Sequence, residues 1–272
     1  MDFVFDYGAH LVAQHEVVPF VMTNTHAHAQ YELYFCPQEI FQNTVINGVE
    51  YSFQHPCAIL SMPYTVHLMS CDENATDYDR YVFYFGEKTI SAFGGSHIPK
   101  KIFSDGESLL FKLTKDEAQE LKEIAQLLES SKTVSQRELI FALFVNKLEF
   151  LCPDDRIEKI VSPIFYIQNI LQYISDNFEK ELSTEKIARE FAVSRAKLER
   201  DFKKFTGNTV HDFIDVCRIN KAKNLLGYNM DMSVEEIAYS CGFKNKNYFF
   251  PFFKKIVGKT PAEYRKAQNK AK

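Results

Sequence analysis

The chain of 272 residues contains no tryptophan, and none of its six cysteines belongs to a CxxC pair. A disulfide framework or a cysteine-based zinc site needs closely spaced or regularly paired cysteines, so neither is expected. The scattered thiols instead favour a reducing compartment. The missing tryptophan removes the side chain that usually stacks most strongly on sugars.

Signals for export and for membrane insertion are also absent. The first ten residues, MDFVFDYGAH, carry two acidic residues and no basic one, which does not fit a secretory signal peptide. Residues 51–71 lack Lys, Arg, Asp and Glu, but they contain two prolines and two histidines. A membrane-spanning helix avoids such residues, so we expect strands there and a cytoplasmic protein with no membrane partner.

The composition is that of an ordinary globular protein, with 46% hydrophobic and 25% charged residues. These values exclude a mainly disordered, collagen-like or coiled-coil chain, and the length favours two domains. Charge divides unevenly between the halves. Residues 1–165 carry 12 basic and 23 acidic residues, a net −11, whereas residues 166–272 carry 20 and 13, a net +7. The basic rear half indicates a polyanionic partner.

The front half is predicted to form short strands followed by helices. Aromatic and β-branched runs between residues 20 and 85 are separated by prolines and by Asn47-Gly48, a strong signal for a two-residue hairpin. Several such strands favour a sandwich or a small barrel. We therefore expect an α+β protein with a β-rich sensing domain over 1–151, a linker over 152–163 and an all-α domain over 164–272.

Beyond residue 113 the hydrophobic period becomes helical. Two sets of residues each share one helical face: Leu113, Leu121, Ile124 and Leu128, then Leu139, Ala142, Leu143 and Leu148. Such helices either cover the strands or join two copies of the chain. We favour a homodimer through residues 113–150, because antiparallel helix pairs with bare leucines form two-fold interfaces readily.

Three histidines and one glutamate lie among the predicted strands, in the patterns His26-x-His28-x3-Glu32 and Pro63-x3-His67. The first three share parity, so on one strand they point to the same face. Three imidazoles and a carboxylate suit a divalent transition metal, and they equally suit the polar lining of a small-molecule pocket. The spacing resembles the two cupin motifs, but the second motif keeps only its proline and histidine.

Because the second motif is incomplete, we favour the pocket over the metal and expect no cofactor. The predicted effector site consists of His26, His28, Glu32, Tyr34 and His67. A region rich in Tyr and Phe, with His and Glu, suits a sugar or another small polar metabolite.

The rear half contains an internal repeat. SxEKIA from Ser183 returns as SxEEIA from Ser233, and FKKFTG ending at Gly207 returns as FKKIVG ending at Gly258. Each copy is predicted to form a helix, a tight turn and a basic second helix, with one helix over 210–226 between the copies. Such a second helix is the element that helix-turn-helix proteins place in the major groove of DNA.

The most specific pattern lies over residues 238–265, and it reads Ala238-x2-Cys241-Gly242-Phe243-x4-Tyr248-Phe249-x3-Phe253-Lys254-Lys255-x2-Gly258-x-Thr260-Pro261-x2-Tyr264-Arg265. It resembles the signature of the AraC/XylS family of bacterial transcription regulators. The resemblance covers 166–272 strongly and 20–150 weakly, as a cupin-like sensing β-barrel followed by dimerising helices. It implies a cytoplasmic, effector-responsive regulator that binds double-stranded promoter DNA. RNA polymerase is a further candidate partner.

The same resemblance assigns residues to DNA. Base-facing places fall on Ala196, Glu199 and Arg200 in the first reading helix and on Lys246, Asn247, Phe250 and Pro251 in the second. The full predicted DNA-binding set is Arg195, Ala196, Lys197, Glu199, Arg200, Lys203, Lys204, Lys246, Asn247, Phe250, Lys254 and Lys255. Arg200 suits guanine and Asn247 suits adenine, whereas the paired lysines suit phosphates. Pro251 is expected to kink the second reading helix or delay its start.

Two other function classes fit parts of the sequence. A cupin-type metalloenzyme with a helical docking domain needs a complete metal site, and one of the two motifs here is degraded. A DNA-repair protein needs a reactive cysteine, and no cysteine has a Pro-Cys-His setting. We therefore expect a regulator and not an enzyme.

Overall fold

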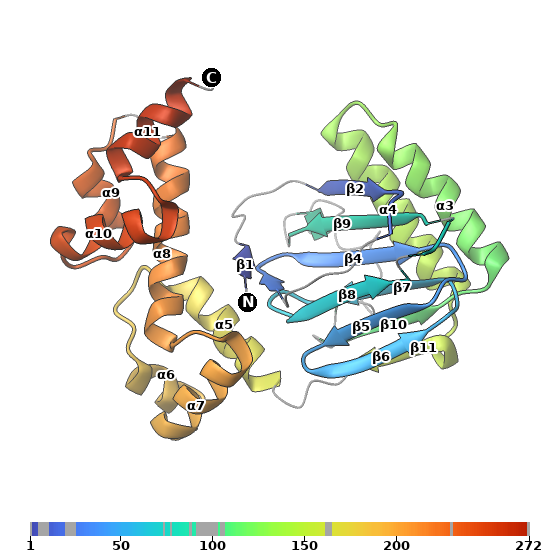
Figure 1. Cartoon of the computed structure of the whole chain (residues 1–272), viewed down its shortest axis with the longest axis horizontal. Helices are drawn as coiled ribbons and strands as arrows, with labels where there is room; N and C mark the ends of the chain where they lie inside the picture. Colours follow the sequence, from blue (N-terminus) through green and yellow to red (C-terminus); the bar gives the residue numbers. More distant parts are fainter. Residues whose placement is uncertain are drawn as a thin grey trace. The chain divides into compact units, whose positions relative to one another are not determined.

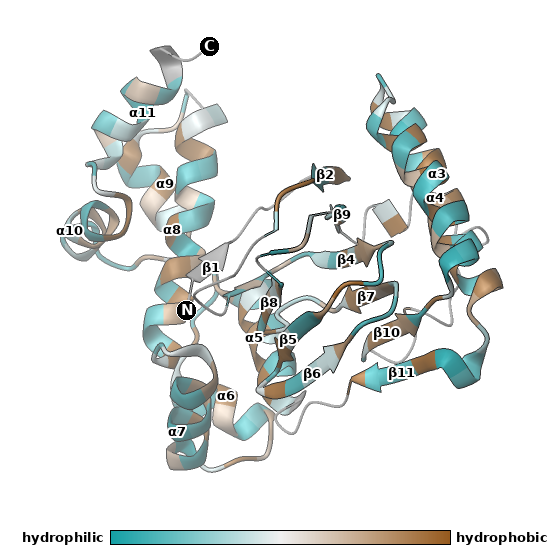
Figure 2. Ribbon diagram, turned by 45° about the vertical axis from the view of Figure 1, so that its right-hand side comes forward, coloured by the Kyte–Doolittle hydropathy of each residue, from teal (hydrophilic) through white to brown (hydrophobic). Residues whose placement is uncertain are grey.

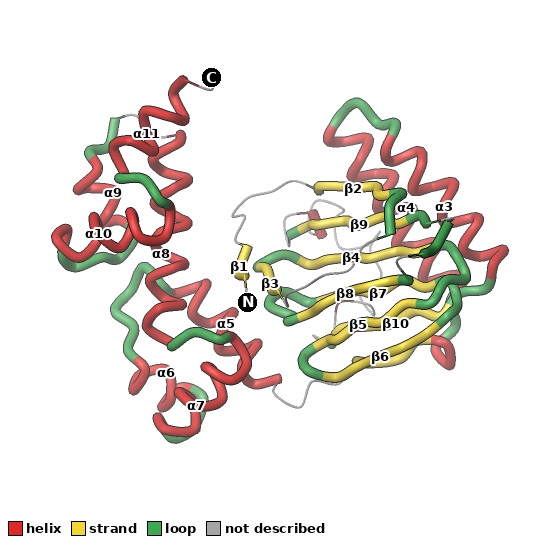
Figure 3. The backbone as a smooth tube through the Cα atoms, viewed as in Figure 1, coloured by secondary structure: helices red, strands yellow, loops and turns green. Residues whose placement is uncertain are grey.

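The computed structural model describes residues 2–4, 11–19, 26–72, 74–76, 78–86, 89–90, 103, 107–160, 165–228 and 231–270. The chain divides into two compact units, Met1–Phe165 and Tyr166–Lys272. Unit 1 holds the described strands and the long helices α3 and α4, and the described part of unit 2 consists of helices joined by turns and loops (Figure 3). The α+β class expected from the sequence is confirmed.

Unit 1 is built on two β-sheets (Figure 1). One sheet has the strand order β1-β3-β8-β5-β6, and the other has the order β11-β10-β7-β4-β9-β2. The strands are β1 (Asp2–Val4), β2 (Val12–Glu16), β3 (His26–His28), β4 (Tyr31–Cys36), β5 (Gln42–Ile46), β6 (Val49–Phe53), β7 (Cys57–Ser61), β8 (His67–Cys71), β9 (Arg80–Phe85), β10 (Ser108–Lys112) and β11 (Ile157–Ile160). No ladder between described residues joins the two sheets, so the closed barrel that the sequence favoured is not confirmed.

The hairpin at Asn47-Gly48 has the predicted geometry. Asn47 and Gly48 have φ angles of +52° and +82°, and the flanking residues Ile46 and Val49 pair across β5 and β6. A type I′ turn requires positive φ at both central residues, which Asn and Gly tolerate best. This turn fixes the register of the hairpin.

The side chains of β4 point alternately into two separate hydrophobic cores. Leu33 and Phe35 point to one face, where they pack with Leu121 and Phe144 of the helices. Tyr34 on the other face packs with side chains of the opposite sheet, such as Ile46 and Met69. Because neighbouring side chains of a strand point to opposite faces, one strand serves both cores.

Two helices cover the outer face of the six-stranded sheet (Figure 2). They are α3 (Lys115–Glu129), capped by Thr114, and α4 (Val134–Leu151), capped by Thr133. Of the predicted leucine faces, Leu113, Leu121, Leu128 and Leu148 are buried against this sheet, whereas Leu139 and Leu143 are exposed. The first leucine face therefore covers the sheet, which was the alternative that the sequence analysis favoured less.

Part of the segment expected as a linker is structured. After a short 3-10 helix, η1 (Asp154–Arg156), strand β11 pairs antiparallel with β10. Arg156 donates to both carboxylate oxygens of Glu117 at 2.7 Å, and this bidentate pair ties the segment to α3. The linker prediction for 152–163 is therefore wrong up to Ile160, and residues 161–163 lie outside the described residues.

Unit 2 contains the predicted repeat. Its helices are α5 (Phe165–Asn177), α6 (Thr184–Glu190), α7 (Arg195–Thr206), α8 (Val210–Tyr228), α9 (Val234–Ser240), α10 (Lys246–Val257) and α11 (Pro261–Lys270). The turns match: Val193 N donates to Ala188 O at 2.9 Å, and Phe243 N donates to Ala238 O at 3.1 Å. Two helix-turn-helix units, α6–α7 and α9–α10, are thus present on either side of α8.

Gly242 brings the second turn against the end of α5. Its φ is +91°, and a Cβ built on it would lie 2.7 Å from Glu179 O and 2.9 Å from Phe178 O. Ala192 holds the equivalent place in the first unit, with φ of +51°. Of these two positions, Gly242 alone also lies against another stretch of backbone, and this approach is a second reason for glycine there.

We predict that Gly242→Ala destabilises unit 2 more than Gly258→Ala does. Both glycines have positive φ, which costs an alanine about 1–2 kcal/mol. Gly258 has nothing within 4 Å of its built Cβ, so it is a matched control. At Gly242 the collision with backbone adds about 1–3 kcal/mol, as overpacking does elsewhere. Urea unfolding of the full chain, followed by helical circular dichroism, checks this difference, and equal losses for the two variants would refute the close approach.

Candidate nucleic-acid interface and effector site

The first reading helix, α7, presents the residues that the sequence assigned to DNA. Ser194 caps it by accepting from Lys197 N, and Gly207 ends it in the left-handed conformation. Leu198, Phe202 and Phe205 face the core, so the helical period turns the remaining positions outward. All twelve predicted DNA-binding side chains, on α7 and α10 together, are exposed.

Acidic side chains hold several of these cations in the free protein. Arg195 donates to Glu199 at 2.8 Å, and Arg200 lies 3.0 Å from Asp201. Lys197 also contacts Asp201, and this hydrogen bond is the main cause that lowers the pKa of the Asp201 carboxyl. The basic side chains of these pairs are exposed, whereas Asp201 is half-buried, and an ion pair at the surface contributes about 0–1 kcal/mol. They orient the side chains and open at little cost.

The second reading helix, α10, begins at Lys246 with Asn245 as its cap, so it does not start late. It continues through Pro251 to Val257, and Pro251 lies on the exposed face. Proline removes the bond to the carbonyl four residues back, that of Asn247. Asn247 is also exposed, so its carbonyl is not enclosed in the core.

The paired lysines stand at the end of each reading helix. Lys203 and Lys204 lie in the last turn of α7, and Lys254 and Lys255 lie in the last turn of α10. Within the described part of the chain, none of the four has a carboxylate within ion-pair distance. Together they form two exposed positive surfaces at equivalent places of the repeat.

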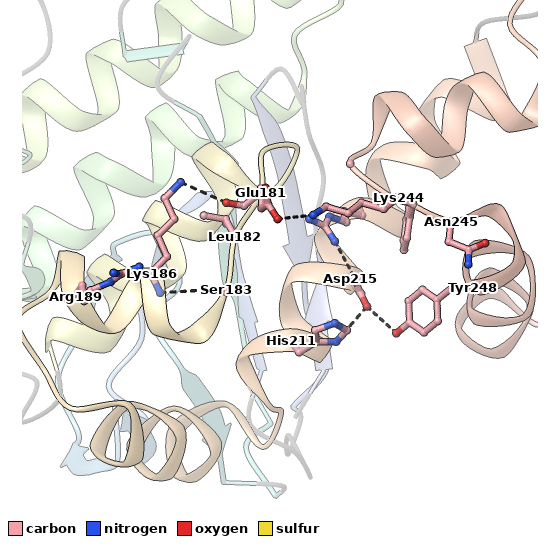
Figure 4. Close-up of a pocket in the computed structure, with 13 residues that line it drawn as sticks. Glu181, Leu182, Ser183, Lys186, Arg189, His211, Asp215, Lys244, Asn245 and Tyr248 are labelled. Atoms are coloured by element: carbon pink, nitrogen blue, oxygen red, sulfur yellow. Dashed lines mark hydrogen bonds and ion pairs between the residues drawn. The ribbon is translucent and has the colours of Figure 1, made fainter.

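Helix α8 connects the two helix-turn-helix units, and it carries a buried carboxylate, Asp215, that was not predicted from the sequence. Asp215 is only 1% exposed; it accepts from Arg218 at 3.1 Å and from the hydroxyl of Tyr248 at 2.8 Å (Figure 4). Burial and this hydrogen bond raise the pKa of Tyr248 to about 12. Arg218 also donates to Phe178 O at 2.9 Å. Arg218 of α8 therefore contacts the end of α5 directly, and it reaches helix α10 through Asp215.

A groove of about 530 Å³ lies beside this network, between the two helix-turn-helix units. Its lining, from both helix-turn-helix units and α8, mixes basic and acidic side chains: Lys186, Arg189 and Lys244 with Glu181 and Asp215, and the imidazole of His211. Lys244 pairs with Glu181 across it (Figure 4). The sequence held one signal for the network, because Asp215 and Arg218 fall on the same helical stripe as the buried Ala222.

In unit 1 the predicted polar group converges. His26, His28, Glu32 and His67 come from β3, β4 and β8, and one ligand atom of each lies within 4.8 Å of the others. Glu32 Oε2 is 3.0 Å from His28 Nε2 and 3.3 Å from His67 Nε2. His28, Glu32 and His67 are buried, and His26 is half-buried.

The backbone orients two of these rings. Nδ1 of His28 donates to Gln30 O at 2.9 Å, and Nδ1 of His67 donates to Thr65 O at 2.9 Å. A carbonyl oxygen only accepts, so Nδ1 carries the proton and Nε2 points at Glu32. Burial alone would raise the pKa of Glu32, but the charges and hydrogen bonds of His67 and His28 lower it well below its usual value.

The structure differs from the predicted site at two tyrosines. Tyr34, on the same face of β4, does not join the cluster but donates to Gln42 at 2.8 Å. The cavity beside it holds only about 10 Å³, close to the minimum for one water molecule. Tyr84 was not predicted; it pairs with Glu32 across β4 and β9, and burial and the Glu32 carboxylate raise its pKa. Strand pairing, which the sequence does not reveal, brings Tyr84 there.

Comparison with known proteins places unit 2 among helix-turn-helix domains. A model of the helix-turn-helix domain family matches residues 187–267. The HTH-type transcriptional activators RhaS of Escherichia fergusonii and Salmonella paratyphi B are 33% and 28% identical to the chain over 137 and 157 residues. These matches cover 50% and 56% of the chain, and the chain spans about half the length of these relatives, 48% and 55%.

Within the described residues, no helix has both the length and the apolar character that crossing a membrane requires.

Among solved structures, a transcriptional regulator of the AraC-type DNA-binding domain-containing proteins from Chromobacterium violaceum is 30% identical. It matches 38% of this chain and 90% of its own length, with a TM-score of 0.35. With the signature over 238–265 and the two helix-turn-helix units, the family model and the RhaS relatives show that the chain belongs to the AraC/XylS family of DNA-binding transcription regulators.

Proposed function

We propose that this chain regulates transcription by binding double-stranded promoter DNA through α7 and α10, under the control of an effector bound in unit 1. The observation that carries the proposal is the duplicated unit, in which two exposed second helices each end in a pair of exposed lysines. DNA-binding helices of this type enter successive major-groove segments. The net +7 of residues 166–272 supplies attraction to phosphate.

The proposed contacts differ between the two helices. On α7, Arg200 bridges O6 and N7 of guanine, Glu199 accepts from cytosine N4, and Ala196 touches a thymine methyl. On α10, Asn247 bridges adenine, and the exposed Phe250 packs on a thymine methyl. Lys246 also faces the bases, Lys203, Lys204, Lys254 and Lys255 approach phosphates, and Arg195 and Lys197 complete the DNA-binding surface of α7.

Unit 1 is proposed to sense the effector at the cluster of His26, His28, Glu32 and His67. Buried, convergent polar groups that come from both sheets are the usual anatomy of a binding site. A sugar or another small polar metabolite remains the proposed effector class. All six cysteines are buried and form no disulfide, which fits the cytoplasm proposed for a DNA-binding regulator.

A homodimer through residues 113–150 remains part of the proposal, on a different face from the one first considered. Leu139, Leu143 and Phe150 are 69%, 53% and 81% exposed, and their spacing places them on one side of α4. Leu127 of α3 is also exposed at 55%. A second copy of this chain would remove these side chains from water. RNA polymerase is a further proposed partner once the protein is on DNA.

We predict opposite kinds of loss for Arg200→Ala and Lys204→Ala. Arg200→Ala should cost about 1–3 kcal/mol on a selected site and relax the preference at one base pair. Lys204→Ala should weaken binding to all sequences alike and flatten the salt dependence, because a phosphate contact carries no base information. Affinities for selected and scrambled DNA at two salt concentrations check both variants. Wild-type affinity that does not change with salt would count against the proposed function itself.

A second prediction concerns Phe250. Uracil in place of the contacted thymine removes one methyl group and should cost wild-type protein about 0.8 kcal/mol. Phe250→Ala should bind the thymine and uracil sites equally. Ile256→Ala, an exposed apolar residue in the last turn of α10, should keep the wild-type difference. Each thymine of a selected site is replaced in turn, and a loss that is the same with and without Phe250 would remove it from the interface.

For the dimer, Leu143→Asp should give a monomer at micromolar concentration with nearly unchanged thermal stability, because the side chain is exposed. Leu121→Asp changes a residue of the first predicted leucine face, and it should instead destabilise unit 1, because Leu121 is fully buried. Sedimentation and thermal unfolding separate the two effects. A wild-type chain that sediments as a monomer would end the dimer proposal.

A further inference from the structure

Asp201 of the first reading helix holds three polar side chains at once. Its oxygen Oδ2 accepts from the hydroxyl of Tyr166 on α5 and from Nζ of Lys197, both at 2.5 Å. Its other oxygen, Oδ1, accepts from Nε of Arg200 at 3.0 Å. The Asp201 side chain is 16% exposed, whereas that of Arg200 is 71% exposed. An inward-facing carboxylate therefore holds an arginine whose guanidinium faces solvent.

The two carboxylate oxygens have separate tasks. Lys197 lies four residues before Asp201 on α7 and Tyr166 comes from α5, so Oδ2 is bound from two elements and the carboxylate cannot turn freely. A plain ion pair along one helix, between Lys197 and Asp201, would need neither the phenol nor the guanidinium. The contact at Oδ1 therefore serves the orientation of Arg200 and not the stability of the helix.

The atom by which Arg200 is held decides what the rest of its guanidinium can do. A guanidinium presents its N–H donors in a rigid, planar fork. Only Nε is used by Asp201, and the terminal nitrogens Nη1 and Nη2 make no hydrogen bond or ion pair with a described residue. These two nitrogens match O6 and N7 of guanine, the contact proposed for this residue. The bond to Asp201 and the contact with guanine can therefore exist together.

Arg195, the other arginine of α7, uses its guanidinium differently. Its Nε donates to Glu199 at 2.8 Å, and its Nη1 lies 2.5 Å from a carboxylate oxygen of Glu185 on α6. A terminal nitrogen of Arg195 is thus already bound to protein. Of the two arginines on this helix, only Arg200 keeps both terminal nitrogens available for a base.

We propose that Asp201 is a positioning residue, which holds Arg200 ready to contact a guanine in the major groove. This inference rests on the proposed function and deepens it. The ordering of one long side chain at an interface weakens binding by a factor of about 2–12, and Asp201 meets this cost before DNA arrives. Its negative charge also opposes phosphates, so it disfavours DNA on which Arg200 finds no guanine. Both effects increase specificity more than affinity.

The test uses the full chain and a DNA site selected from random sequences. Each G·C pair of the site is replaced in turn by A·T, and the pair whose preference disappears in Arg200→Ala is the contacted one. Asp201→Asn should reduce the preference at this pair about 2–12-fold. It should bind scrambled DNA at least as tightly as the wild type, because a charge that repels phosphate is gone.

A double-mutant cycle separates positioning from general damage. In the Arg200→Ala background, Asp201→Asn should not change the preference at the contacted pair, because its effect passes through the missing guanidinium. Glu190→Gln is the matched control: Glu190 is an exposed acid of α6 that forms no ion pair with a described residue. It removes the same charge from unit 2 and should keep the wild-type preference.

An unchanged guanine preference in Asp201→Asn, or an equal loss on every DNA, overturns the positioning role, and so does an Arg200→Ala variant that keeps every preference. If Asp201→Asn does not fold, as judged by helical circular dichroism, Tyr166→Phe decides, because it frees one contact of Oδ2 and keeps the charge. A reduced preference then supports positioning, and a wild-type preference overturns it. Salt-dependent DNA binding by the wild type is measured alongside: if it is present, only the positioning role fails, and if it is absent, the proposed function fails separately.

Discussion

The arrangement of unit 2 depends on one buried carboxylate. Asp215 is held between Arg218, which also reaches the end of α5, and the hydroxyl of Tyr248 on α10. A buried charge is stable only when its hydrogen bonds are complete, so all three elements must keep their places together. Gly242 serves the same junction by letting the second turn approach backbone at Phe178 and Glu179. The two reading helices therefore share one rigid support, although they arise from separate copies of a repeat.

In unit 1 the corresponding constraint is the alternation of β4. Odd-numbered residues of this strand complete the core under α3 and α4, and Glu32 and Tyr34 point between the sheets. The strand cannot slip by one residue without burying Glu32 among phenylalanines, so its register is strongly determined. The same alternation brings Glu32 opposite the three histidines of the other sheet.

Much of the fold could be predicted from sequence wherever the signal is local. The two helix-turn-helix copies and the hairpin at Asn47-Gly48 depend on neighbouring residues, and both are confirmed. Features that depend on distant pairing were missed or misjudged: strand β11 in the expected linker, Tyr84 beside Glu32, and the burial of Leu121. His26, His28 and Glu32 do lie together, but the prediction that they share one strand was wrong, because His26 and His28 lie on β3 and Glu32 lies on β4 of the other sheet. Parity along β4 also included Tyr34, because period alone does not tell how far along a strand a site extends.

The continuity of α8 also has a consequence for the nucleic acid. Its 19 residues run without a break between the two reading units, and Arg218 and Asp215 anchor its middle. A support of this kind does not stretch to match the spacing of grooves on a straight duplex. If both helices engage DNA as proposed, any mismatch in spacing has to be taken up by the duplex, and a smooth bend costs about 1–6 kcal/mol. Base pairs that no side chain touches then affect affinity through their stiffness, so flexible pyrimidine–purine steps between the two contacted segments would be preferred.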